Sequence, residues 1–227
     1  MVENGLLPEA ELVRAAEAED FRAAMTILGE HGYGEGRTLE NPRDFVKLLS
    51  EEEAKAYELV FSSLPDQEEL ALFRAPKDFH NAKAALKAEF LGIEPDGYMT
   101  EGGSFEPKAM VTMIRERNFM FFSAELKEAV SEAAELFAKG RDPQEIDIIL
   151  DRACYRQMLR QAEECGDQFL IGYVRLLIDI LNVTAFVRLR QIGKPWTFFQ
   201  KVFLAGGNMA ESLFVSSYEE NYQQLAD

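Results

Sequence analysis

Two stretches of the sequence carry the same three polar residues at the same spacing. Arginine, aspartate and asparagine follow one another at intervals of four and three residues, as Arg74, Asp78 and Asn81 and again as Arg175, Asp179 and Asn182. On a helix, these intervals place a guanidinium, a carboxylate and an amide on one face, about one turn apart. Each polar stripe could tie down a neighbouring loop or helix end, line a cavity in which a partner inserts, or take part in catalysis.

The catalytic interpretation lacks the groups that would have to accompany it. The sequence has two histidines, His31 and His80, and neither belongs to a Glu-x-x-His motif, which counts against a di-iron bundle and a zinc protease. Asp147 and Asp151 stand four residues apart, a spacing more typical of a solvated helix face than of a metal site. The glycines of 32–37 lack the pattern of a phosphate-binding loop and indicate a turn. We therefore expect no catalytic residue, no metal and no cofactor.

The structural interpretation of the stripes is the favoured one, because a polar group on an apolar helix must find a partner. It expects the aspartates and asparagines to hold a nearby loop or helix end, and each arginine to pair with its aspartate. The interpretation as a shared cavity expects the two stripes to face an inserted partner instead.

The composition indicates a soluble helical protein. The chain has 227 residues, 47% of them hydrophobic, which is enough to build a core in one to three domains. Its net charge of −16 repels phosphate backbones, so we expect no nucleic acid partner, while a basic protein partner would suit it. The first residues lack a signal peptide, and the two cysteines, eleven residues apart on one expected helix, are too distant for a disulfide. We expect a cytoplasmic protein.

The elements that position the stripes are expected to be helices. An N-capping residue followed by proline marks helix starts at 41–44 and 142–145, and glycine marks helix ends at Gly166 and Gly193. Pro76 is expected to break or kink the helix that carries the first stripe. No segment shows the alternation of a strand, so the chain is predicted to be all-α.

The most apolar segment, 169–187, contains the second stripe. A membrane-spanning helix would have to bury Arg175, Asp179 and Asn182 in lipid, which is costly. We expect a core helix of the protein and no membrane span.

The two stripes belong to a longer internal repeat. Residues 42–92 and 143–193 align without gaps at an offset of 101 residues, with nine of 51 positions identical, where composition alone gives about three. The matched positions include helix starts and helix ends, which strengthens the alignment.

Paired glycines recur after each stripe, at Gly102-Gly103 and at Gly206-Gly207, and a helical stretch follows each pair. The segment after Gly5 reads alike, so three units begin and two are complete. The predicted organisation is a first helical repeat in 1–102, a second in 103–206 and the start of a third in 207–227.

Three stretches carry a resemblance to a known family. KDFHNAKAALKA (77–88), LIDILNVTAFVRLRQIG (177–193) and FLAGGNM (203–209) resemble the C subunit of archaeal and bacterial V-type ATP synthases, called d in vacuolar ATPases. The family pattern is an Asp-x-x-Asn helix in each domain with a Gly-Gly turn after it. The matching residues here are Asp78, Asn81, Asp179, Asn182, Gly206 and Gly207, and the similarity spans nearly the whole chain.

The resemblance implies an all-helical protein of three similar domains, arranged with pseudo-threefold symmetry as a funnel-like socket. Its wide mouth would receive the central shaft subunits D and F, and its narrow end would sit on the membrane rotor ring. The implied role is non-catalytic: coupling of the shaft to the ring for proton or sodium transport, at the cytoplasmic face of the membrane. A helical scaffold that binds a partner peptide between its repeats is the alternative.

The resemblance also implies a third complete repeat, whose Asp-x-x-Asn motif would fall near position 280 at the observed offset. We therefore expect the parent protein to be longer, unless this is a diverged short form.

Overall fold

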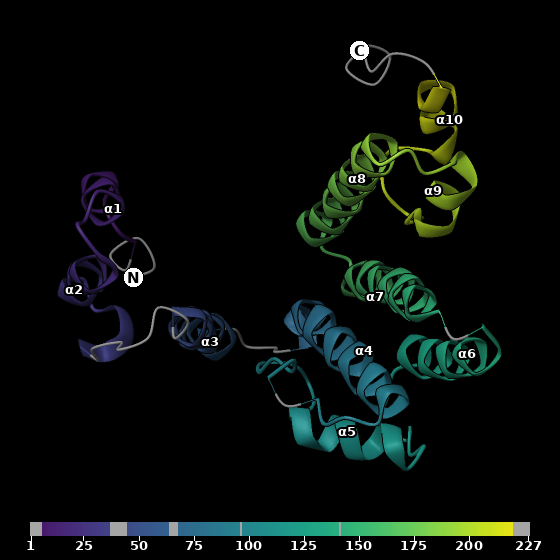
Figure 1. The fold of residues 1–227 in the computed structure, drawn as a ribbon, viewed down its shortest axis with the longest axis horizontal. Coiled ribbons are helices and arrows are strands. Elements are labelled where there is room, and N and C mark those ends of the chain that lie inside the picture. Colours follow the sequence, from purple (N-terminus) through teal and green to yellow (C-terminus); the bar gives the residue numbers. More distant parts are fainter. Residues whose placement is uncertain (1–5, 37–44, 64–67, 96, 141, 220–227) are drawn as a thin grey trace. The chain divides into compact units, whose positions relative to one another are not determined.

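The computed structural model describes residues 6–36, 45–63, 68–95, 97–140 and 142–219, and these residues form helices joined by loops, without a strand (Figure 1). The prediction of an all-α protein is confirmed. The helices in chain order are α1 Glu9–Ala16, α2 Phe21–Glu30, η2 Tyr33–Gly36, α3 Phe45–Ser63, η4 Glu68–Phe73, α4 Ala75–Leu91, α5 Pro107–Arg115, α6 Ala124–Gly140, α7 Pro143–Cys165, α8 Gln168–Gln191, α9 Trp196–Val202 and α10 Glu211–Glu219.

The chain divides into two compact units, residues 1–65 and 66–227. In the first unit, α1 packs on α2, and η2 contacts both α2 and α3. The Glu52 carboxylate on α3 accepts a hydrogen bond of 3.0 Å from the Gly34 amide, which fixes η2 to α3. The second unit contains both polar stripes and both glycine pairs. The repeats predicted in 1–102, 103–206 and 207–227 divide the chain by internal sequence similarity, not by compactness. They stay a prediction.

Several helix ends lie where the capping signals predicted them. The Asp142 carboxylate accepts from the Gln144 amide at 2.9 Å, Pro143 lies in the first turn of α7, and Gly166 ends that helix with a φ of +76°. Of the break or kink expected at Pro76, the structure has a break: η4 ends at Phe73 and α4 begins at Ala75. The proline lies in the first turn of α4, where its missing N–H costs nothing, and it does not kink that helix. The cap expected at Asn41 and Pro42 lies outside the described residues.

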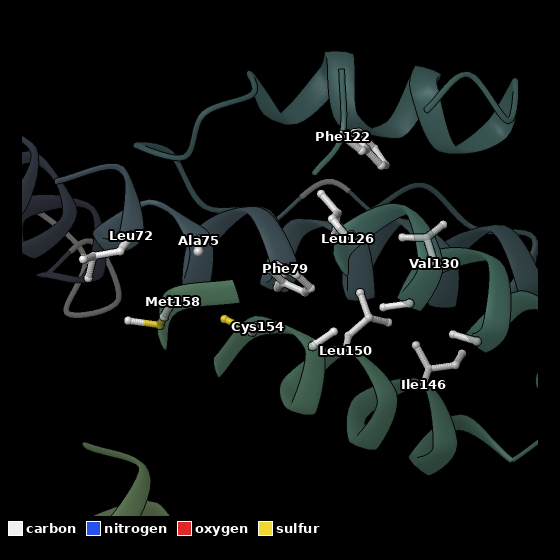
Figure 2. Close-up of a cluster of buried hydrophobic side chains, with 14 of the residues drawn as sticks. Leu72, Ala75, Phe79, Phe122, Leu126, Val130, Ile146, Leu150, Cys154 and Met158 are labelled. Atoms are coloured by element: carbon white, nitrogen blue, oxygen red, sulfur yellow. The ribbon is translucent and has the colours of Figure 1, made fainter. Parts of the chain in front are cut away.

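The main core of the second unit joins η4, α4, α6 and α7. Figure 2 shows Leu72, Ala75 and Phe79 of η4 and α4 lying among Leu126 and Val130 of α6 and side chains of α7. The α7 side chains drawn there are Ile146, Leu150, Cys154 and Met158. Phe79 is 1% exposed, so its side chain is fully enclosed in this core.

A second apolar cluster holds the C-terminal half of α8 against α9 and α10. Phe186, Phe199 and Phe214 are all fully buried, and their rings lie 5.2–5.6 Å apart. Trp196 packs on Phe199 with a ring separation of 5.3 Å.

In the described part of the chain, α8 is the one helix long and apolar enough to cross a membrane by length and composition, although 33% of its most apolar window is buried in the protein. Its buried side, which includes Val174, Ile178 and Phe186, contributes to both apolar clusters. The expectation of a core helix therefore fits one side of α8, and the opposite side exposes apolar residues.

Candidate functional site

The first polar stripe ties α4 to the loop that follows it. The carboxylate of Asp78, on the first turn of α4, accepts hydrogen bonds from the backbone amides of Ser104 at 2.8 Å and Phe105 at 3.3 Å. One turn further, the Asn81 amide donates to the Thr100 carbonyl and accepts from the Thr100 amide, both at 2.8 Å. Both side chains are buried, so these bonds satisfy polar groups that have little access to water.

The second stripe makes the same kind of attachment on α8. The Asp179 carboxylate accepts from the backbone amides of Met209 at 2.9 Å and Asn208 at 3.1 Å, and from the Asn208 side chain at 2.8 Å. Asn182 donates to the Leu204 carbonyl at 2.8 Å and accepts from the Leu204 amide at 2.9 Å. We call each arrangement a loop clamp: the Asp78–Asn81 clamp and the Asp179–Asn182 clamp.

The glycine pairs are required by the clamps. A Cβ atom on Gly103 would lie 2.3 Å from the Asp78 carboxylate oxygen, and one on Gly207 would lie 2.2 Å from that of Asp179. The preceding glycines, Gly102 and Gly206, have φ angles of +85° and +101°, which L side chains rarely adopt. The first glycine of each pair therefore turns the chain and the second lets the backbone approach the carboxylate.

The two arginines of the stripes differ from each other, and Arg175 departs from the expected pairing with its aspartate. The positive charge of Arg74, the N-terminal flanking residue of α4, acts on Asp78 and opposes, in small part, the rise in its pKa. Arg175 forms an ion pair with Glu163 of α7 at 3.3 Å, so its described partner is not the expected Asp179. Arginine at this position joins α8 to the preceding helix.

The net pKa shift of Asp78 is upward. Burial of the carboxyl group raises its pKa, and the hydrogen bonds from Ser104 and Phe105, together with the Arg74 charge, only partly oppose this effect. The ionised form of Asp78 therefore destabilises the folded state, and protonation removes this destabilisation.

This shift predicts a pH-dependent difference between the protein and Asp78→Asn. The variant keeps a side-chain oxygen that can accept from Ser104 and Phe105 but does not titrate. Because the folded pKa of Asp78 is raised, its contribution to stability becomes more favourable as the pH falls through that pKa. Urea unfolding at pH 8 to pH 4 should show the wild-type chain gaining stability relative to Asp78→Asn on acidification. A constant difference, or one of opposite slope, would contradict the burial of this carboxylate.

The other sequence candidates have structural partners. Asp147 and Asp151, expected on a solvated face, form ion pairs from α7 to Lys87 at 2.6 Å and Lys83 at 2.7 Å on α4. In the sequence, the signal for these two ion pairs was the spacing of Lys83 and Lys87, which are four residues apart like the two aspartates. The ring of His80 bonds through Nε2 to the Tyr98 carbonyl at 2.9 Å, in the same loop that the Asp78–Asn81 clamp holds.

The two free cysteines differ in their burial. Burial raises the pKa of the Cys154 thiol to about 12, while Cys165, at the end of α7, is exposed. No group of three or more potential metal ligands lies together among the residues described.

A cavity of about 510 Å³ lies beside the second clamp, between α7, α8 and α9. Its wall includes Asp147, Asp151 and Arg188, together with apolar residues. Asn182 borders the cavity, but its amide is engaged by Leu204. The arrangement can fix loops on helices, and the carboxylates of the two clamps already serve as acceptors for backbone amides.

Comparison with known proteins supports the resemblance seen in the sequence. The family model of the ATP synthase (C/AC39) subunit matches residues 1–227. The chain is also similar to the C subunit of the V-type sodium ATPase of Enterococcus hirae, with 26% identity over 146 residues, which are 64% of this chain and 44% of the relative. The match thus spans less than half the length of that relative. The chain belongs to the family of the V-type ATP synthase C subunit.

Proposed function

We propose that this chain is a non-catalytic central-stalk subunit of a V-type ATPase or ATP synthase, coupling the rotating shaft of subunits D and F to the membrane rotor ring. The family match over the full 227 residues carries this proposal. The complex would transport protons or sodium ions, and the chain would lie at the cytoplasmic face of the membrane as a peripheral part of it.

The loop clamps support a mechanical role. A subunit that transmits torque must keep its helices and loops in fixed register under load, and a buried bidentate amide plus a buried carboxylate at each turn resists their separation. The clamps at Asp78–Asn81 and at Asp179–Asn182 are separated by the same offset of 101 residues as the sequence repeat. We propose that three units, in 1–102, 103–206 and from 207 onward, form the wall of a socket for the shaft, and that the two described clamps hold the first two of them.

The surface charge agrees with a protein partner of opposite sign. With a net charge of −16, the chain would attract a basic shaft or ring surface over long range, and this attraction should weaken with added salt. Neither clamp offers a free nucleophile or base, which fits a coupling role better than a catalytic one.

The test is binding to purified D–F shaft and to detergent-solubilised rotor ring from a V-type ATPase. We expect the folded chain to bind at low salt, with an affinity that falls as salt is raised to several times physiological. The matched control is the longer C subunit of the Enterococcus hirae sodium ATPase under the same conditions. Failure of the folded chain to bind either partner, while it captures unrelated helical peptides, would replace the coupler by the scaffold alternative.

A further inference from the structure

The turn between α5 and α6 presents two apolar side chains to solvent. Met120 and Phe121 are 78% and 71% exposed, and they occupy the two central positions of a turn in which the Phe122 amide donates to the Phe119 carbonyl at 3.2 Å. Central turn positions usually carry glycine, proline or short polar residues. The turn itself therefore does not account for a methionine and a phenylalanine at its tip.

The residues on either side of the tip are anchored in the protein. Phe122 is buried, and its ring lies 5.3 Å from Phe119 and 5.3 Å from Phe105. The aromatic residues before and after the tip thus form its base, and only Met120 and Phe121 stand outside. We call these two residues the apolar tip.

Arg117 fixes the start of this turn in an unusual backbone conformation. Its φ is +56°, the one positive value of a non-glycine residue among those described. The amides of Arg117 and Asn118 donate to the carbonyls of Ile114 and Met113 at 3.2 and 2.9 Å, a helix-ending pattern that usually has glycine in this place. Here the side chain has its own role, because the guanidinium pairs with Glu89 of α4 at 2.8 and 2.9 Å.

The other end of the turn is fixed by Ser123. Its hydroxyl accepts from the Leu126 amide at 3.1 Å, at the start of α6, and donates to Gln157 of α7. The turn is therefore attached to α4 on one side and to α7 on the other. An apolar tip that is already held in place loses little conformational freedom on binding, which favours affinity.

The internal repeat does not require an apolar tip. The helical stretch after Gly5 corresponds to the one after Gly102-Gly103, so the link between α1 and α2 corresponds to this turn. That link reads Glu-Ala-Glu-Asp at 17–20 and is acidic. The same connection is thus polar in one repeat and apolar in the other, which indicates a contact that is specific to the second repeat.

The charges around the tip favour a protein partner over a lipid surface. Three ion pairs near the turn balance one another: Arg115 with Glu94, Arg117 with Glu89, and Arg160 with Glu125. Glu116 and Lys127, exposed on either side, carry opposite charges. Anionic lipid attracts basic segments, and neither this neutral surrounding nor the net charge of −16 provides one. An apolar pocket of a protein is the matching partner.

We propose that Met120 and Phe121 insert into an apolar pocket on the cytoplasmic side of the membrane rotor ring. This inference rests on the proposed function, and it chooses between the partners named there. The ring is built of membrane-spanning subunits and is the more apolar partner, whereas the overall negative charge suits a basic shaft. The last described helix, α10, packs on α8 and α9, so the chain continues from that side of the protein and not from this turn.

Binding of the full chain to V-type rotor ring in lipid nanodiscs tests the proposal, with empty nanodiscs of the same lipids as the reference. Met120→Ser combined with Phe121→Ser should weaken ring binding at least 30-fold, because both apolar anchors are lost. Shaft binding and the urea midpoint should not change, since both residues are exposed. Leu136→Ser is the matched control: this residue is 39% exposed and lies twelve residues after the start of α6, so ring binding should stay unchanged.

A photo-crosslinker gives an independent arm. With p-benzoylphenylalanine in place of Phe121, illumination should join the chain to a ring subunit, and the same group in place of Leu136 should not. Crosslinking from position 121 to lipid, to the shaft, to a second copy or within the chain would overturn the proposal. Ring binding that survives the double serine variant would overturn this inference alone. A wild-type chain that binds neither ring nor shaft would reject the proposed function as well.

Discussion

Gly207→Ala is expected to lower the free energy of unfolding of the 66–227 unit by about 3 kcal/mol. The new Cβ atom would lie 2.2 Å from the Asp179 carboxylate oxygen and 3.0 Å from the Ile178 side chain. The carboxylate cannot swing away freely, because both of its oxygens accept hydrogen bonds from Asn208 and Met209. Either the turn moves off α8 or these bonds break, and each route exposes buried polar groups.

Gly103→Ala should cost a similar amount, because its Cβ atom would lie 2.3 Å from the Asp78 oxygen and 3.5 Å from the Asp78 backbone nitrogen. The matched control is Gly140→Ala at the end of α6, where no atom lies within 4 Å of the added Cβ. That change should be neutral, or stabilising by up to about 1 kcal/mol. Urea unfolding followed by circular dichroism gives all three values, and equal values at Gly207 and Gly140 would contradict the close approach.

The loop clamps could be predicted from the sequence because each of their parts has a recognisable local pattern. Asp and Asn three residues apart on an apolar helix need partners, and paired glycines that begin 24 residues after Asp78 and 27 residues after Asp179 provide backbone that can come close. The structural interpretation of the stripes follows from these two facts. What spacing alone could not tell was which backbone amides the carboxylates would accept from.

Other contacts of the site depend on how helices distant in sequence pack. The ion pairs of Asp147 and Asp151 with lysines of α4 join residues 60 and 68 positions apart, and no single-helix pattern predicts them. Arg175 likewise finds Glu163 on α7, a choice set by the crossing of α7 and α8. The effect of Pro76 depends on where η4 ends and α4 begins, because a proline kinks the interior of a helix but fits its first turn.

The loop after the second stripe shows how a repeat can diverge while its clamp persists. The asparagine bonds to a residue 19 positions later in the Asp78–Asn81 clamp and 22 positions later in the Asp179–Asn182 clamp. The extra length accommodates α9 and the aromatic cluster around Phe199. Length in a connecting loop changes at little energetic cost, whereas the bonds to a buried amide tolerate no change in geometry.

Asn182→Ala is accordingly expected to destabilise the 66–227 unit by about 3 kcal/mol or more. Asn182 is 1% exposed, and it bonds to both backbone groups of Leu204, so truncation leaves a buried N–H and a buried C=O without their partner. Each such group costs about 1–3 kcal/mol, and the small cavity adds to this sum.

Two variants separate the loss of the amide from general disturbance of the turn. Asn208→Ala removes one of three hydrogen bonds to Asp179 but leaves both backbone donors in place, so it should cost only about 1 kcal/mol. Asn182→Asp keeps an acceptor for the Leu204 amide but turns a second oxygen toward the Leu204 carbonyl, so it should remain well below wild type. If Asn182→Ala and Asn208→Ala unfold at the same urea concentration, the clamp does not hold the loop. A much lower urea midpoint for Asn182→Ala than for Asn208→Ala, with faster hydrogen exchange at the Leu204 amide, would show that Asn182 holds the loop before the Gly206-Gly207 turn.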